Sequence, residues 1–490
     1  NPAKWVFPDI TIGPGEYIVV LASGKNVTDT QKKNLETNFS ISAEGDAIFL
    51  FAPDGTLIDK LLLGRAHADV SYGRSNGQLM YYASPTPGAA NSGGMIGYAE
   101  KPEFSTPAGV YTSAESVSIK VPEGCTVRYT TDCTTPTESS PIYSSPITVS
   151  TNTVIRARAF RQGYEPSDTA TATFFIRSGS QTLESHDTPF TIISLVTDPD
   201  NMFGTTNGIY VAGSKFAEKD PTGDAASFTI PDDTANVNWK YANFNAQHQT
   251  NPDPLGLNWE RPVHIEVIDT NGSFEYGDDA MVRVFGAFSR YKSQKGLALV
   301  TRGGYGASAL NDAFFGNRTY TSYKSLTLRP SAMDCFMSKI RDVLIQGLLE
   351  DAGSILPTQA YRRTIVYING KYWGIYNLRE KVNKYFLAQH YNIGNPDAID
   401  VLVGNGVTEA SQISGTNAYL EYKELIDWVG SHDLSNPDNY AYIQTKIDVE
   451  NFAEYCAMEI FVGNTDTGNI KFWKSAAYDN KWRWIPYDFD

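Results

Sequence analysis

The chain has 490 residues, which at about 150 residues per domain predicts about three domains. Hydrophobic residues make up 41% and charged residues 19%, so each domain can bury a core and wholesale disorder is excluded. With 40 Lys and Arg against 55 Asp and Glu, the net charge is −15, which argues against nucleic acid as the main partner. No stretch approaches the roughly 20 apolar residues that span a bilayer, so we expect no transmembrane segment.

Four cysteines in 490 residues are too few for a disulfide framework, and only Cys125 and Cys133 lie close in sequence. The residues between them, Thr126–Thr131, are typical of one strand, which would hold the two Cα atoms about 26 Å apart. A disulfide requires Cα atoms within roughly 7 Å, so we predict two free thiols. A bulge or turn inside the stretch is the alternative that would shorten the distance.

Residues 1 to about 178 contain short apolar runs separated by Pro and Gly turns, a pattern typical of β-sandwich modules. A stretch rich in Pro, Gly and Ser at 85–94 divides this region, and a second break falls at 178–183. The sequence therefore predicts two all-β modules followed by a third region. The chain opens at Asn1 without a charged and apolar leader, so we expect any targeting segment to have been removed or to lie outside this sequence.

The first module, residues 1–92, carries motifs along nearly its whole length: Ile12-Gly-Pro-Gly-Glu-Tyr-Ile-Val-Val20, Leu50-Phe-Ala-Pro-Asp-Gly55, Ser71-Tyr-Gly-Arg74 and Pro85-Thr-Pro-Gly-Ala-Ala-Asn91. In these motifs it resembles the lamin tail domain. The resemblance implies an immunoglobulin-like sandwich used for attachment, without catalysis. The family's usual opening strands are missing, which suggests that the sequence starts inside the domain.

The second module, residues 99–177, contains Lys101-Pro-Glu-Phe-Ser105, Val127-Arg-Tyr-Thr-Thr-Asp132 and Ile155-Arg-Ala-Arg-Ala159. It resembles the small sandwich found at the C-terminus of chitobiase-type enzymes. Cys133 stands where that family usually has Gly, so the geometry of this turn is open. We interpret the module as a spacer.

From Thr191 onward, strands and helices mix. Residues 333–351 predict one helix, and Asp448 can cap another. We interpret the apolar stripes of both as buried core; they consist of Phe336, Ile340, Val343, Leu344 and Leu348 in the first helix and Phe452, Tyr455, Cys456 and Ile460 in the second. Residues 363–378 predict a hairpin that turns at Asn369-Gly370.

Two acidic clusters lie near the end of the sequence. Gly463-Asn-Thr-Asp-Thr-Gly-Asn469 follows the second helix, and the last residues are Pro486-Tyr-Asp-Phe-Asp490. In an extended ending, Asp488 and Asp490 share one face, so with the Asp and Asn oxygens of the loop they can converge on a hard cation such as Mg²⁺. Ordinary turn chemistry is the alternative interpretation.

Lys295 alternates onto the same face as Leu297 and Leu299, and a lysine on a buried face needs an anionic partner such as phosphate. The alternative is that Lys295 lies at the start of the strand and reaches water. Gly303-Gly-Tyr-Gly306 lacks the lysine and the helix of a phosphate-binding loop, so we predict a turn there.

The order of motifs between residues 190 and 490 resembles the CotH family, a set of atypical protein kinases named for a spore-coat kinase. The matching motifs are Gly286-Ala-Phe-Ser-Arg290 with Lys295, Phe315 followed by Ser325-Leu-Thr-Leu-Arg329, Asp334 with Ile340-Arg-Asp342, Tyr367-Ile-Asn-Gly-Lys-Tyr-Trp-Gly-Ile-Tyr376 with Glu380, Asn464-Thr-Asp466 with Asn469, and Pro486-Tyr-Asp-Phe-Asp490. The expected fold is therefore multidomain, with two all-β immunoglobulin-like sandwiches followed by an α+β atypical protein-kinase-like domain at 190–490.

The resemblance implies ATP and Mg²⁺ as cofactors and assigns roles to single residues. Lys295 would contact the nucleotide phosphates, and Asp466 would orient or deprotonate the acceptor hydroxyl. Asn469 and Asp488, with Asp490 on the same face, would hold Mg²⁺. Positioning and charge neutralisation are most of what phosphoryl transfer requires.

Three further residues have open roles. Arg290 can add a second phosphate contact, and Glu380 can accept a nucleotide hydroxyl where the hinge should lie; for both, solvated charge is the alternative. Asp342 lies off the apolar stripe and either pairs with Lys295 or faces water.

Two departures from the expected pattern matter. Asp466 and Asn469 are three positions apart, whereas ordinary protein kinases separate the corresponding residues by five, so the roles come from this family and not from kinases at large. The family also continues past the final Asp-x-Asp run, so we expect that a missing C-terminal part can leave this fragment inactive.

The leading hypothesis is a secreted or surface-attached protein whose last domain transfers phosphate from ATP to a protein hydroxyl. Its rival is a non-catalytic surface adhesin that uses the kinase-like domain as a scaffold for an unknown partner. A carbohydrate-active enzyme comes third, because chitobiase-like modules travel with such enzymes.

Overall fold

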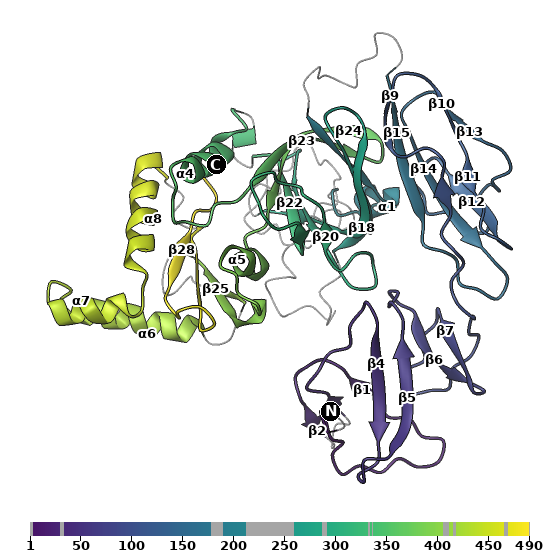
Figure 1. Ribbon diagram of the computed structural model, residues 1–490, viewed down its shortest axis with the longest axis horizontal. Coiled ribbons are helices and arrows are strands. Elements are labelled where there is room, and N and C mark those ends of the chain that lie inside the picture. Colours follow the sequence, from purple (N-terminus) through teal and green to yellow (C-terminus); the bar gives the residue numbers. More distant parts are fainter. Residues whose placement is uncertain are drawn as a thin grey trace, which may run out of the picture.

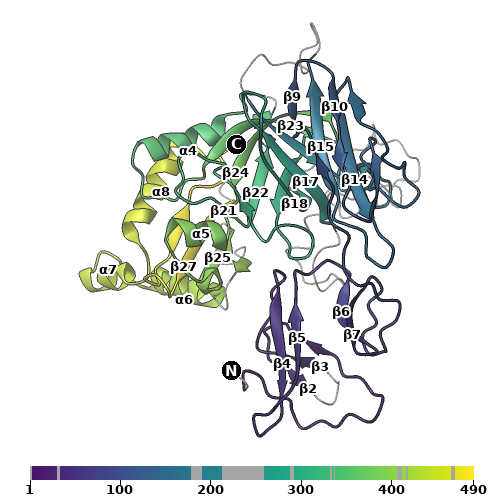
Figure 2. The same cartoon turned by 45° about the vertical axis from the view of Figure 1, so that its right-hand side comes forward.

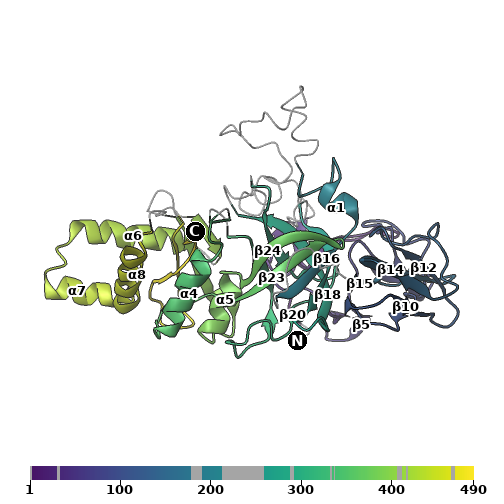
Figure 3. The same ribbon diagram turned by 90° about the horizontal axis from the view of Figure 1, so that it is seen from above.

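The computed structural model describes residues 3–29, 34–177, 190–211, 259–286, 292–331, 334–335, 337–404, 411–414, 418–464 and 469–489. A helical C-terminal part, a central barrel and a β-sandwich lie in a row, and the first module lies below the barrel (Figure 1). Figure 3 shows the same row from above. The strand-rich N-terminal part and the mixed C-terminal part confirm the predicted multidomain fold class.

The first module consists of small sheets. Its strands are β1 (Val20–Leu21), β2 (Thr28–Asp29) and β3 (Asn34–Glu36) in the order β1-β3-β2, the antiparallel pair β4 (Asp46–Phe51) and β5 (Leu57–Leu63), and the antiparallel pair β6 (Ser71–Ser75) and β7 (Gln78–Tyr82). Large apolar side chains of β4 and β5, among them Phe49, Ile58 and Leu62, are exposed. The strand content agrees with the expectation, and the resemblance to the lamin tail domain stays a prediction.

The second module is a sandwich whose main sheet has the order β12-β14-β15-β9. Its strands are β8 (Glu103–Phe104), β9 (Gly109–Tyr111), β10 (Glu115–Val117), β11 (Ile119–Lys120), β12 (Thr126–Thr130), β13 (Ile147–Val149), β14 (Thr153–Phe160) and β15 (Ala170–Ile176). Ile155 and Phe174 face its core together with Val117. The alternation along β14 that buries Ile155 and Ala157 is the pattern that predicts a half-buried strand.

All four cysteines lie in the described ranges and are free, which confirms the prediction for Cys125 and Cys133. β12 ends at Thr130, so the strand between them is shorter than predicted. Cys133 has φ of 68°, so a non-glycine residue adopts the left-handed conformation at the turn where Gly was expected. Its buried side chain packs with Val154 and Val196, contacts that a glycine at this position could not make.

A closed barrel lies at the centre of the chain (Figure 2). Its strands are β16 (Thr191–Val196), β17 (Arg261–Ile268), β18 (Phe274–Phe285), β19 (Gly296–Val300), β22 (Ser325–Arg329), β24 (Lys371–Glu380) and β23 (Tyr361–Ile368), in that spatial order. β16 closes the barrel because it pairs antiparallel with β17 and parallel with β23. Beside the barrel lie the short helix α1 (Pro199–Phe203) and the pair β20 (Leu310–Asn311) and β21 (Ser322–Tyr323).

β23 and β24 confirm the predicted hairpin. Its two turn residues, Asn369 and Gly370, have φ of 52° and 73°. A two-residue hairpin turn of this kind requires left-handed φ at both positions, which Asn and Gly adopt most readily. The turn therefore fixes the register of the two strands that form one wall of the cleft described below.

The C-terminal part contains a four-stranded sheet in the order β26-β25-β27-β28, with helices around it (Figure 2). Its elements are α4 (Arg341–Asp351), α5 (Lys384–His390), the 3₁₀ helix η3 (Pro396–Ala398), β25 (Ile399–Val403), β26 (Ser411–Ser414), α6 (Ala418–Ser431), α7 (Pro437–Gln444), α8 (Val449–Val462), β27 (Lys471–Ser475) and β28 (Arg483–Ile485). Asp448 caps α8 as predicted, since its carboxylate accepts a 3.1 Å hydrogen bond from the Asn451 N–H. None of the described helices has the length and apolar character needed to cross a membrane.

The apolar stripes predicted as core are wrong for several members. Leu344 and Leu348 of α4 are 51% and 53% exposed, and Ile460 of α8 is 81% exposed. Ile340 and Phe452 are exposed too, whereas Val343 and Tyr455 are buried as predicted; Phe336 lies outside the described residues. The buried face of α4 carries Asp342 and Gln346 beside Val343, because this face meets a polar surface that hydropathy does not reveal.

The second sandwich is fixed to the barrel through buried contacts. The Thr173 N–H donates to Glu266 Oε1 at 2.9 Å, and the hydroxyls of Thr173 and Ser194 lie 2.9 Å apart. Phe175 extends from the sandwich into an apolar cluster of the barrel, where its ring centroid lies 4.5 Å from that of Tyr367. These contacts join the two parts into one packed unit.

The turn predicted at 303–306 is where the first module meets the barrel. The Ala68 N–H donates to the Gly304 carbonyl at 2.9 Å, and Arg65 Nη2 donates to the Gly306 carbonyl at 2.6 Å. Gly306 has φ of 156°, and a Cβ atom there would lie 1.9 Å from the carbonyl oxygen of Asp279. Only glycine fits this close approach of two backbones.

The neighbouring residues Phe174 and Phe175 provide a matched test of the joint between sandwich and barrel. Phe174 faces the core of the sandwich, and Phe175 faces the barrel. We expect Phe175→Ala to destabilise both parts by about 3–5 kcal/mol in one shared transition, because it removes core from their interface. Urea unfolding followed by two probes, with Phe174→Ala as the comparison, measures this. A barrel transition that Phe175→Ala leaves unchanged would show that the two parts unfold independently.

Candidate active site

A cleft lies between the outer face of the barrel and the C-terminal sheet. Side chains alternate along β22, so Leu326 and Leu328 point into the barrel core while Thr327 and Arg329 point outward. Thr327 pairs with Arg379 of β24, which also faces outward. The cleft has a volume of about 10 Å³ and is lined by Phe285, Thr327, Arg329, Gln359, Arg379, Glu380, Lys381, Val382, Lys471 and Tyr487.

The opposite wall is the antiparallel pair β27 and β28, in which Lys471 lies opposite Ile485. Asn469 precedes β27 by two residues, and Asp488 follows β28 by three. Because the strands run in opposite directions, the start of β27 and the end of β28 meet at the same end of the pair. The fold thus brings Asn469 and Asp488, which are 19 positions apart in sequence, to one edge of the cleft.

Arg329 of the barrel forms an ion pair with Asp488 across the cleft. The pair joins residues 159 positions apart and is largely shielded from solvent on both sides. Asp488 has φ of 66°, in the left-handed region that Asp adopts more readily than most residues. Non-glycine residues held in this backbone conformation concentrate at functional sites.

Lys471 lies next to this pair. Its Nζ atom is 3.7 Å from the ring centroid of Tyr487 and 3.5 Å from the carbonyl oxygen of Val382. Burial lowers the pKa of the Lys471 ammonium group to about 7, although the negative charge of Asp488 acts in the opposite direction. Three charged groups from the two walls therefore face one small space.

Helix α4 holds the C-terminal segment in place. Asp342 forms a buried ion pair with Arg379 and also accepts a 3.4 Å hydrogen bond from the Phe489 N–H. Gln346 Nε2 donates to the Pro486 carbonyl at 3.0 Å. Asp342 was expected either to pair with Lys295 or to face water. Neither is the case, because it is buried and its partner is Arg379. The polar face of α4 thus links the barrel wall to the segment that carries Asp488.

Lys295 lies on the other side of the barrel wall from the ion pair. Its neighbour Leu297 belongs to the barrel core, so alternation carries Lys295 to the inner face, whereas Arg329 points outward. Lys295 Nζ donates to the Lys292 carbonyl at 2.7 Å and lies 5.3 Å from the ring centroid of Tyr210. Burial lowers the pKa of Lys295 to about 8. The structure does not bring Lys295 to the face where Asp488 lies, and its phosphate contact stays a prediction.

Glu380 is buried and held by several partners. Arg318 Nε donates to it at 2.9 Å and the Ala360 N–H at 2.8 Å, and the Tyr320 hydroxyl donates to its other oxygen. Burial raises the pKa of Glu380, but His390, Arg318 and Tyr320 outweigh that effect and hold it below its ordinary value. A nucleotide hydroxyl would have to displace one of these partners, so the predicted contact remains untested.

Arg290, Asp466 and Asp490 lie outside the described residues. Of the predicted metal ligands, Asn469 and Asp488 are therefore the two whose positions the structure gives. Within the described ranges, no three His, Cys, Asp or Glu side chains gather as a metal site. The donor set still suits a hard cation, because carboxylate and amide oxygens are the ligands that Mg²⁺ prefers.

The sequence interpretation missed the cations of the cleft, which are Arg329, Arg379, Lys381 and Lys471. One signal was present for Arg329, because Ser325-Leu-Thr-Leu-Arg329 alternates and places the arginine opposite the leucines. The partners of these cations could not be identified, since they come from distant parts of the chain.

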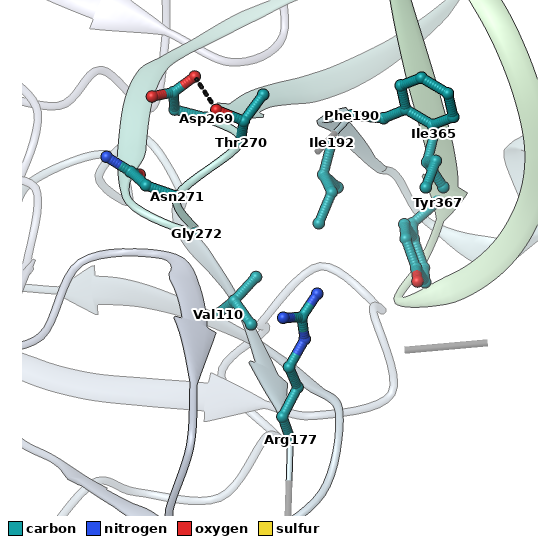
Figure 4. A pocket seen from close by; sticks show the side chains of 10 residues that line it. All are labelled: Val110, Arg177, Phe190, Ile192, Asp269, Thr270, Asn271, Gly272, Ile365 and Tyr367. Atoms are coloured by element: carbon teal, nitrogen blue, oxygen red, sulfur yellow. Dashed lines mark hydrogen bonds between the residues drawn. The ribbon is translucent and has the colours of Figure 1, made fainter. Parts of the chain in front are cut away.

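A larger cavity, of about 60 Å³, lies at the joint between the second sandwich and the barrel. Figure 4 shows Arg177 pointing into it from the sandwich, with Asp269 and Asn271 on the turn across from it. Asp269 already pairs with Arg362 at 3.4 Å. This cavity lacks the clustered charges of the cleft. Although it is larger, it is therefore not the better candidate for the active site.

Two family models match the chain. Residues 282–490 match the model described as CotH kinase protein. The chain carries a CotH kinase family domain. Residues 106–171 match the model described as chitobiase/β-hexosaminidase C-terminal domain, which confirms the predicted resemblance of the second module. No curated protein matches the chain.

The CotH match begins inside β18, at Val282, whereas the barrel also requires β16 and β17, which precede it. The structural unit therefore extends beyond the matched range on its N-terminal side. The match covers every residue of the cleft lining listed above. The match with this family model suggests that residues 282–490 form an atypical kinase-like domain.

The ion pair between Arg329 and Asp488 predicts a stability effect. We expect Asp488→Ala to destabilise the metal-free protein by about 1–3 kcal/mol, because it removes the carboxylate beside a buried guanidinium. If Asp488 instead only repelled neighbouring acidic groups, its removal would leave the stability nearly unchanged. The free energy of unfolding of Asp488→Ala and of the parent, measured with denaturant in the presence of a chelator, distinguishes these two outcomes.

The double variant Arg329→Met with Asp488→Ala is the control for this experiment. It should recover part of the lost stability, because no charge is then left without its partner. If the double variant loses as much as the sum of the single variants, the ion pair does not couple the two walls.

Proposed function

We propose that the C-terminal domain is an atypical protein kinase that transfers the γ-phosphoryl group of ATP to a protein hydroxyl. The observation that carries the proposal is the meeting of Asn469 and Asp488 at one edge of the cleft, opposite Arg329. Oxygen ligands for a hard cation and a guanidinium for phosphate then face the same space. The CotH family match supports this reading.

We assign the following roles to the residues of this chain. Asn469 and Asp488 hold Mg²⁺, which when bound neutralises charge on the phosphate oxygens. We assign the phosphate contact to Arg329 in place of Lys295, because Arg329 points to the cleft face. A phosphate that binds there would compete with Asp488 for the Arg329 guanidinium, which would leave the Asp488 carboxylate available to hold the metal.

Asp466 acts on the acceptor. The acceptor oxygen forms a bond to the γ-phosphorus while the bond from that phosphorus to the β–γ bridging oxygen breaks. The proton of the acceptor hydroxyl goes to the Asp466 carboxylate, and ADP leaves. Arg290 and Asp490 are proposed as an additional phosphate contact and an additional metal ligand.

We further propose that the protein is secreted or attached to a cell surface, because the first module resembles a domain used for attachment. The rival function, a non-catalytic surface adhesin, has one observation in its favour. The β4–β5 hairpin exposes Phe49, Ile58 and Leu62, and clustered apolar side chains on a surface often mark interaction sites.

A substitution at Asp466 separates chemistry from nucleotide binding. We expect Asp466→Asn to leave ATP affinity nearly unchanged but to lower phosphoryl transfer about 10²-fold or more, since it removes a positioned general base. The assay follows labelled γ-phosphate onto the protein itself and onto added acidic and basic acceptor proteins, with ATP affinity measured by calorimetry. Asp433→Asn is the matched control, because Asp433 lies in an exposed turn between α6 and α7.

A parent protein that neither transfers phosphate nor binds ATP with any of several divalent metals would refute the kinase proposal and leave the adhesin as the better reading. Equal transfer by Asp466→Asn and the parent would keep the kinase but remove Asp466 from its mechanism. Arg329→Met and Lys295→Met, compared for ATP affinity, decide which cation contacts the phosphates.

A further inference from the structure

Two lysines line the cleft beside the connection that leads from the barrel to α5, and we call this part of the cleft its inner end. Lys381 directly follows β24 of the barrel, and Lys471 begins β27 of the opposite wall. Lys471 Nζ lies 3.5 Å from the carbonyl oxygen of Val382, the residue after Lys381. The two walls therefore contribute one lysine each at the connection that leads from the barrel to α5.

Both ammonium groups face the cleft. Lys381 Nζ lies 5.8 Å from the ring centroid of Phe285, and Lys471 Nζ lies 3.7 Å from that of Tyr487. Both rings line the cleft. Aromatic faces attract ammonium groups but do not neutralise their charge.

The carboxylates around the cleft are already engaged by arginines. The pairs are Glu260 with Arg302 and Arg283, Asp342 with Arg379, Glu380 with Arg318, and Asp488 with Arg329. Within the described ranges, Lys381 and Lys471 form no ion pair with a carboxylate closer than 4 Å, although Glu260 attracts Lys381 and Asp488 attracts Lys471 from farther away. The inner end of the cleft therefore holds two lysines that have no carboxylate at ion-pair distance among the described residues.

This arrangement has an energetic cost. An ammonium group taken out of water without a counter-ion destabilises the folded protein. Burial, with the positive charges of Arg283 and Lys471, lowers the pKa of Lys381 well below its ordinary value. A bound anion would offset this cost by supplying the missing negative charge.

The lining does not suit the base of a nucleotide. A base requires an apolar slot that covers both of its faces. The cleft offers Phe285, Val382 and Tyr487 among mainly charged and polar side chains, and Lys471 Nζ already lies over the Tyr487 ring. Phosphate oxygens, in contrast, accept the hydrogen bonds that lysines and arginines donate. The chemistry of the lining thus selects an anion.

We propose that Lys381 and Lys471 form a phosphate-binding site at the inner end of the cleft, so that a phosphoryl group and not the base of the nucleotide occupies it. The inference rests on the proposed kinase function in one respect, since it takes the ligand to be a nucleoside polyphosphate. The same chemistry would bind free polyphosphate. Arg329, Lys471 and Lys381 then form a row along which a phosphate chain lies, with the base directed outward.

Binding also requires a movement of the two walls. The cleft volume of about 10 Å³ has room for about one water molecule, which is less than a phosphate group needs. The walls are joined by the short connection at Lys381 and Val382, so separation of the walls there would admit the ligand. A phosphate bound between Lys381 and Lys471 would then draw the walls together.

The test is calorimetric titration of the full-length protein with three probes: inorganic tripolyphosphate, ATP and adenosine, each with and without Mg²⁺. We expect tripolyphosphate and ATP to bind and adenosine to show no binding. Lys381→Met and Lys471→Met should each weaken both phosphate ligands about tenfold or more. Lys371→Met, at the exposed far end of β24, is the matched control and should bind like the parent.

Thermal unfolding accompanies each titration. Both Lys→Met changes remove a buried charge, so neither should lower the melting temperature. If Lys381→Met fails to fold, Lys381→Gln replaces it, since glutamine keeps a polar head group without the charge.

The outcomes separate this inference from the kinase proposal. Lysine-dependent binding of tripolyphosphate without any phosphoryl transfer supports the phosphate site and refutes the kinase. Phosphoryl transfer with unchanged ATP affinity in both Lys→Met variants refutes the phosphate site and leaves the kinase standing. Adenosine that binds as tightly as ATP, or no binding by any probe, also overturns the inference.

Discussion

The alternation of side chains along β22 and β24 is the constraint on which the cleft depends. A closed barrel must fill its interior, so Leu326, Leu328 and Leu378 point inward. Their neighbours Thr327, Arg329 and Arg379 must then point outward, toward the C-terminal sheet. The barrel core and the cationic wall of the cleft are therefore two faces of the same strands. A shift of the register by one residue would exchange them and destroy both.

Local signals in the sequence predicted local structure well. Asn369-Gly370 identified the β23–β24 hairpin because the turn requires left-handed residues at both positions, and Asp448 identified the start of α8 because its carboxylate can accept from the first turn. Both depend on neighbours in sequence. The order of family motifs likewise identified the kinase-like domain without any knowledge of distances.

Long-range polar contacts could not be predicted in this way. Helical periodicity marked Leu344 and Leu348 as core, but α4 buries Asp342 and Gln346 instead, since these bind Arg379 and the segment at Pro486. Hydropathy cannot show that a polar side chain has a buried partner 140 positions away. Lys295 was predicted from its local pattern with Leu297 and Leu299. The cations of the cleft were missed because their partners are distant in sequence.

The charge of the cleft is opposite to that of the chain. The net charge is −15, yet Arg329, Arg379, Lys381 and Lys471 line one small space. At physiological ionic strength, exposed charges are screened over about 8 Å, whereas buried groups are screened much less. The acidic surface therefore repels an extended polyanion such as nucleic acid, which has to lie along it, but acts weakly on a small ligand inside the cleft. Such an arrangement would favour the compact phosphate ligand proposed above over an extended polyanion.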